Sequence, residues 1–100
     1  MVLEHADIHI KPGTNSEFEA AIERGVTTVI ANAKGFLGYQ VQRGIESPDR
    51  YLLLIRWESV EDHNVGFRGS PAYQEWRAIV GPFFAAPPVV EHFELFVESR

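Results

Sequence analysis

The segment YLLLIRW, residues 51–57, is the feature of this sequence that most constrains the fold. It is almost continuously apolar, and strands of this kind are usually buried on both of their faces. A second strand is predicted over residues 36–45, where imperfect alternation near Gly38 favours a β-bulge. Residues 46–50, between the two strands, are of turn-forming types. The sequence therefore predicts a hairpin whose second strand must be covered from both sides.

Regular patterns continue on either side of this hairpin. Residues 2–10 alternate with a period of two, which predicts a strand. One face of that strand carries Glu4, Ala6, Ile8 and Ile10. Helical spacing of apolar residues predicts one helix over residues 15–33, with a capping box at Thr14 or Ser16 and a stop at Gly35. Residues 89–97 follow two prolines and are predicted to form the final strand.

The segment 59–80 is predicted to form two short helices in place of one long helix. Ser59 has the character of an N-cap, and Gly66 and Gly69 weaken the helix that it begins. Ser70-Pro71 then starts a second helix, with serine as the cap and proline at the first helical position. This arrangement places several aromatic side chains on two short, separately oriented elements.

The resulting order is strand, helix, strand, strand, broken helix, strand. This order is that of an α+β, ferredoxin-like βαββαβ fold with an antiparallel sheet and both helices on one side. The other side of the sheet is too apolar to leave in water, so we expect two copies of the chain to pack sheet against sheet as a homodimer.

Composition excludes several classes of protein. One hundred residues predict a single domain over 1–100. The chain has no cysteine, which removes disulfides and thiolate metal sites, and a net charge of −5 without a basic cluster argues against nucleic acid as a partner. No apolar window of membrane-spanning length and no signal peptide is apparent, so we expect a cytoplasmic protein without a membrane partner.

His63 is the leading candidate for a catalytic residue, because its unperturbed pKa suits proton transfer and it shares a helix face with Phe67. Arg68 and Arg77 are candidates for binding an anionic oxygen of a ligand, although surface ion pairing is the alternative. Tyr73 and Trp76 either belong to the core or line a ligand pocket with their polar atoms. The candidate substrate-binding residues are Phe67, Arg68, Tyr73, Trp76, Arg77 and Phe83.

Two further groups leave alternatives open. Phe83 and Phe84 could close the mouth of a pocket or pack in a dimer interface. His5 and His9 share a strand face but lie about 13 Å apart, too far for one metal ion. His5 and His92 could meet if the first and last strands pair, yet we expect no metal site.

Three stretches of the chain resemble the antibiotic biosynthesis monooxygenase (ABM) domain family. They are EHADIHIKPG, GFLGYQVQRGIESPDRYLLLIRWES and EDHNVGFRGSPAYQEWRAIVGPFF with the following VVEHFE. The resemblance spans almost the whole chain. It implies a ferredoxin-like fold that dimerises through its sheets into a dimeric α+β barrel, with a cavity between the sheet and helices of each subunit.

The resemblance also implies a class of activity. Some members of the family oxidise polycyclic phenols or quinols with O2 and without any cofactor, because a deprotonated electron-rich substrate can itself donate an electron to oxygen. In such a reaction His63 would accept the proton. Members that cleave haem use an asparagine, a tryptophan and a histidine where this chain has Ala6, Phe67 and Arg77, so haem degradation is not expected.

The leading functional prediction is therefore a cofactor-independent monooxygenase acting on a small aromatic or quinol-like substrate. The alternatives are a non-catalytic small-molecule-binding or accessory domain, and a cofactor-free isomerase or lyase that uses His63 as acid and base. Fold transfers between relatives more safely than activity does.

Overall fold

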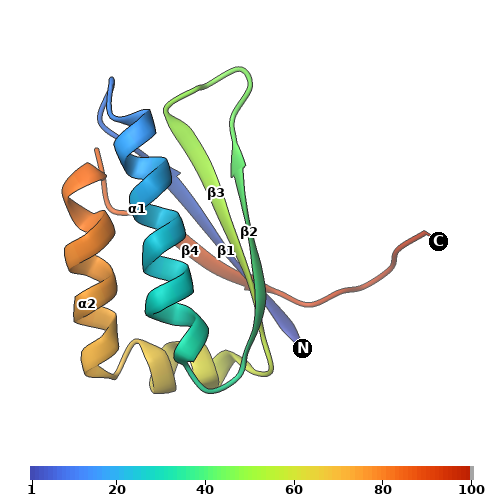
Figure 1. The fold of residues 1–100 in the computed structure, drawn as a ribbon. Coiled ribbons are helices and arrows are strands. Elements are labelled where there is room, and N and C mark those ends of the chain that lie inside the picture. Colours follow the sequence, from blue (N-terminus) through green and yellow to red (C-terminus); the bar gives the residue numbers. More distant parts are fainter. Residues whose placement is uncertain (100) are drawn as a thin grey trace.

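The structure is a computed structural model that describes residues 1–99. It contains one four-stranded antiparallel sheet with two α-helices packed side by side on one of its faces (Figure 1). The elements in chain order are β1 (Val2–His9), α1 (Asn15–Thr28), η1 (Ile30–Asn32), β2 (Phe36–Arg43), β3 (Arg50–Trp57), η2 (Asp62–Phe67), α2 (Pro71–Val80), η3 (Gly81–Phe83) and β4 (Val89–Phe93).

The strand order β2-β3-β1-β4 confirms the predicted ferredoxin-like fold. The β2–β3 hairpin is present, and its register shifts between Phe36 and Gly38, where the sequence predicted a bulge. Strand β1 pairs with β3 on one side and with β4 on the other. The first and last strands of the chain are therefore neighbours in space.

Strand β3 shows different burial on its two faces. The side chains that point toward the helices are buried; they are Tyr51, Leu53, Ile55 and Trp57. On the opposite face Leu52, Leu54 and Arg56 are half-buried. The helices supply the predicted cover on one face, and cover for the other face by a second copy stays a prediction.

Helix α1 ends earlier than the predicted residue 33. It stops at Thr28 and continues as the short 3₁₀ turn η1. The β-branched run from Val26 to Ile30 explains this, because such residues fit a helix poorly. The predicted capping box is also wrong: Thr14 Oγ1 donates to the carbonyl of Lys11 instead of capping the helix.

Strand β4 is shorter than the predicted strand 89–97. Pairing with β1 ends at Phe93, and the chain from Glu94 to residue 99 leaves the body of the molecule without a neighbouring strand (Figure 1). Leu95, Phe96 and Val97 are exposed by 64%, 95% and 74%. A strand needs a hydrogen-bonding neighbour along its length, and within residues 1–99 none is available to this segment.

The core lies between the sheet and the helices. Its largest fully buried side chains include Trp57, Tyr51 and Phe18. Glu4 and His63 are the two buried polar or charged residues among residues 1–99. No helix in this part of the chain has the length and apolar character needed to cross a membrane.

Candidate functional site

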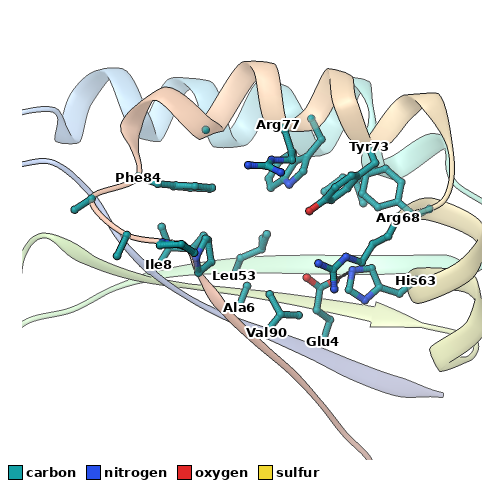
Figure 2. Close-up of a pocket in the computed structure, with 18 residues that line it drawn as sticks. Glu4, Ala6, Ile8, Leu53, His63, Arg68, Tyr73, Arg77, Phe84 and Val90 are labelled. Atoms are coloured by element: carbon teal, nitrogen blue, oxygen red, sulfur yellow. Dashed lines mark ion pairs between the residues drawn. The ribbon is translucent and has the colours of Figure 1, made fainter.

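A cavity of about 480 Å³ lies between α2 and the sheet. Its volume falls within the range of small-molecule sites. Figure 2 shows the sheet residues Ala6, Ile8, Leu53 and Val90 along one wall and α2 along the other. Polar side chains gather at one end, and they are Glu4, His63 and Arg68. The remaining lining residues include Phe67, Tyr73, Trp76, Arg77 and Phe84.

The turn η2 brings His63 and Phe67 to this cavity. It is a π-helix, in which the backbone N–H of Arg68 donates to the carbonyl of His63 over 2.9 Å. A π-turn holds more residues than the about 3.6 of an α-turn, so side chains four residues apart point in nearly the same direction. The rings of His63 and Phe67 are stacked, with centroids 6.5 Å apart and planes 21° apart.

The preceding cap and strand fix the position of this turn. The backbone N–H of Asp62 donates to Ser59 Oγ over 3.1 Å, in agreement with the predicted N-cap. The His63 ring stacks on Trp57, with centroids 5.3 Å apart and an interplanar angle of 20°. The imidazole therefore contacts two aromatic rings, Trp57 and Phe67, which also contact each other with centroids 6.1 Å apart, and these contacts restrict its orientation.

A polar cluster consists of the buried residues Glu4, Trp57 and His63 together with the half-buried His92. Trp57 Nε1–H donates to Glu4 Oε1 over 2.9 Å, and His63 Nε2 lies 3.2 Å from the same oxygen. His63 Nδ1 is hydrogen-bonded to His92 Nε2 over 2.8 Å. Glu4 and His63 are each only 5% exposed. Because β1 pairs with β4, Glu4 lies directly opposite His92, which brings the three titratable groups together.

Burial shifts the pKa values of Glu4 and His63 in opposite directions. Desolvation raises the pKa of Glu4 from 4.5 to about 7, against smaller lowering effects of the Trp57 hydrogen bond and of Arg68. Desolvation, with help from His92 and Arg68, lowers the pKa of His63 from 6.5 to about 4. His63 is thus neutral at physiological pH, and Glu4 changes its charge close to neutrality.

The cavity wall formed by α2 and by the turn before it carries cationic and aromatic groups. The Arg68 guanidinium lies 5.6 Å from the centre of the Tyr73 ring, a distance suited to a cation–π contact. Arg77 also lines the cavity from α2 (Figure 2). Trp76 packs closely on α1 at Gly25, where an added Cβ would lie 2.8 Å from an indole carbon. The two arginines make this wall suitable for an anionic ligand.

Six of the seven candidate residues predicted from the sequence line this one cavity: His63, Phe67, Arg68, Tyr73, Trp76 and Arg77. The seventh, Phe83, is not among the lining residues; its ring packs against Phe18, with centroids 5.9 Å apart. The neighbouring Phe84 lines the cavity in its place.

Sequence reasoning missed Glu4 and His92 as members of the site. The available signal was the single carboxylate of Glu4 on an otherwise apolar strand face. The possible contact between His5 and His92 is not present, because the strand register places His5 opposite Glu91. Within residues 1–99 no group of three or more potential ligands is arranged to hold a metal ion.

Comparison with known proteins identifies the relatives of this chain. The profile of the family described as antibiotic biosynthesis monooxygenase matches residues 1–79. The uncharacterized protein YczJ of Bacillus subtilis is 45% identical over 94 residues, which cover 94% of this chain and 98% of that protein. Its similarity covers almost the whole chain.

Solved structures agree with this assignment. A crystal structure from Bordetella bronchiseptica that bears the family's name is 40% identical, covers 96% of this chain and 97% of that one, and has a TM-score of 0.91. The heme-degrader MhuD of Mycobacterium tuberculosis, with two hemes bound in its active site, covers 100% of both chains at 24% identity and a TM-score of 0.76. At that identity the likeness to MhuD shows the fold alone. The chain therefore belongs to the antibiotic biosynthesis monooxygenase family.

Proposed function

We propose that the protein is a cofactor-independent monooxygenase that oxidises a small aromatic or quinol-like substrate with O2. The observation that carries this proposal is the cavity, in which an apolar wall and aromatic side chains meet an acid–base pair at one end. A flat, electron-rich substrate suits the apolar part, and loss of its hydroxyl proton suits the polar end.

The arginines on the cavity wall support the step that follows proton loss. Arg68 supplies positive charge at the polar end, where a substrate oxyanion would develop, and Arg77 adds positive charge farther along the cavity wall. The anion donates an electron to O2 and then combines with the reduced oxygen. One oxygen atom enters the product and the other leaves as water, so no external reductant is required.

The test uses a naphthoquinol and isotopically heavy O2. We expect protein-dependent oxygen uptake in the presence of a chelator, and a hydroxynaphthoquinone that carries one heavy oxygen atom, measured by mass spectrometry. The dimethyl ether of the quinol is the matched control, because it has no acidic proton and should not react. Arg77→Gln should lower kcat/KM by about tenfold through loss of anion stabilisation.

Other outcomes separate the alternatives. Uptake of oxygen without heavy oxygen in the product indicates simple oxidation to the quinone and contradicts monooxygenation. Tight binding of the quinol without turnover favours a binding domain. Exchange or rearrangement of the substrate without oxygen uptake favours an isomerase or lyase that uses the same acid–base pair.

A homodimer is part of this proposal. The face of the sheet opposite the helices carries half-buried Leu3, Leu52 and Leu54, and exposed Phe93. The exposed segment that contains Leu95, Phe96 and Val97 continues from its edge. A second copy would cover both apolar surfaces, which a monomer leaves in water.

Sedimentation measures the predicted dimer. We expect the wild-type chain to sediment as two copies at micromolar concentration. Leu54→Lys should shift it to one copy, because a charge would lie at the centre of the contact. Gln74→Lys, on the exposed side of α2, adds the same charge away from the sheet and should leave the dimer intact. A wild-type monomer would contradict the prediction.

A further inference from the structure

Glu4 has one oxygen that is held by the protein and one that is not. Oε1 accepts a hydrogen bond from Trp57 Nε1 and lies 3.2 Å from His63 Nε2. Oε2 has no hydrogen-bond partner among residues 1–99, and it is not fully buried, because no fully buried polar side-chain atom in this part of the chain lacks a partner. The free oxygen can therefore meet a molecule bound in the cavity, which Glu4 lines (Figure 2).

His63 is less available to a bound molecule. Its Nδ1 is hydrogen-bonded to His92, and its Nε2 lies against Glu4 Oε1. Its ring packs against both Trp57 and Phe67. Both ring nitrogens thus face protein groups, and the imidazole cannot turn without losing these contacts.

We propose that Glu4 accepts the proton from the substrate, and that His63 and His92 position the carboxylate that does so. This inference rests on the proposed function and replaces His63 by Glu4 as the base. In the step, the substrate O–H bond breaks, an Oε2–H bond forms, and the electron pair remains on the substrate oxygen at the end of the cavity that Arg68 lines. The neutral carboxylic acid then stays in its buried place until the product leaves.

The protonation behaviour of the cluster fits this assignment. A base works best when its pKa lies near the working pH, as that of Glu4 does at about 7. His63, with a pKa near 4, is a weak base. A neutral His63 also keeps Glu4 basic, because a charged imidazolium at this distance would stabilise the carboxylate and lower its pKa.

The charged and titratable groups near Glu4 come from four directions. They are His63 from η2, Arg68 from the turn after it, His92 from β4, and Tyr73 and Arg77 from α2. Among them Arg68 acts to lower the pKa of Glu4, against the larger effect of burial. An experiment must therefore distinguish protonation of Glu4 from protonation of any of these neighbouring groups.

Proton uptake on binding of para-nitrophenolate provides that separation. At alkaline pH the free probe and Glu4 are both ionised, and the bound anion next to a protonated Glu4 is the state that the proposed step produces. Titration calorimetry in two buffers with different heats of ionisation counts the protons. We expect wild-type protein to take up about one proton per bound probe, and Glu4→Gln to take up none.

The controls distinguish the two candidate bases. Glu75→Gln makes the same change at an exposed position of α2 and should keep the uptake. His63→Gln should also keep the proton uptake, but the midpoint of its pH dependence should be displaced. Uptake that persists in Glu4→Gln and disappears in His63→Gln would overturn the proposal.

Turnover of the naphthoquinol provides a second test of which residue is the base. Glu4→Gln should lower kcat/KM by about 10²–10³-fold, whereas His63→Gln should lower it less and shift its pH profile. If wild-type protein takes up no oxygen, the proposed function fails, and the proton count still decides the role of Glu4.

If para-nitrophenolate does not bind, the proposed substrate class fails. The role of Glu4 is then tested by NMR, from the pH dependence of the Trp57 indole N–H resonance. We then expect the indole N–H of Trp57 to shift with pH in wild-type protein and to stay constant in Glu4→Gln. A resonance that does not titrate near neutrality in wild-type protein would overturn the inference.

Discussion

Glu4→Gln is expected to raise the free energy of unfolding by about 3 kcal/mol at alkaline pH, although it removes a residue of the site. Glutamine keeps the oxygen that accepts from Trp57 and cannot ionise. In wild-type protein the folded state holds its proton up to a pH of about 7, whereas the unfolded chain releases it near 4.5. The free energy of unfolding of the wild type therefore falls as the pH rises between these values, and that of the variant does not.

Urea unfolding across this pH range measures the difference. The two proteins should be similar below the unfolded-state pKa of Glu4 and diverge above it. His63 acts in the opposite direction, because its lowered pKa makes the folded state gain stability as the pH rises from about 4 to 6.5. This contribution is present in both proteins and largely cancels. A difference that does not depend on pH would contradict the assigned pKa of Glu4.

Trp57→Phe is expected to lower the free energy of unfolding by about 3 kcal/mol at alkaline pH and by about 2 kcal/mol at acid pH. The smaller ring leaves a void in a position that is 0% exposed, and this cost is the same at every pH. The lost indole N–H adds a cost mainly when Glu4 is ionised, since a buried carboxylate then lacks its donor.

Trp76→Phe is the matched control for this variant. Trp76 is 8% exposed and lines the cavity, but its indole makes no hydrogen bond within the described chain. Its replacement should cost stability equally at acid and alkaline pH. Equal pH profiles for the two tryptophan variants would show that the Trp57–Glu4 hydrogen bond contributes little to stability.

The sequence predicted most of the fold because apolar periodicity and turn residues agree with the tertiary structure along most of the chain. The alternating residues of β1 and the apolar run of β3 lie in the expected strands. Ser59 caps the second helical segment and Pro71 begins α2 as predicted, whereas the Ser70 hydroxyl donates to the carbonyl of Phe67 instead of capping α2. His63, Phe67 and Trp76 reach one cavity for that reason.

The polar cluster could not be predicted in the same way, because it depends on pairing between distant strands. Glu4 and His92 meet only through the register of β1 with β4. The π-turn η2 also has no simple sequence signal, yet it aligns His63 with Phe67. The ends of α1 and β4 differ from their predictions because β-branched residues and a missing neighbouring strand outweigh apolar character.

The pairing of β1 with β4 also determines when, during synthesis of the chain, the acid–base cluster can form. Glu4 leaves the ribosome long before His92, so β4 must be synthesised before the acid–base cluster can assemble. A protease that removed β4 would take away one of its three ionisable groups and leave the hairpin and both helices in the remaining fragment. The mass of the protein should therefore be checked before any preparation is judged inactive.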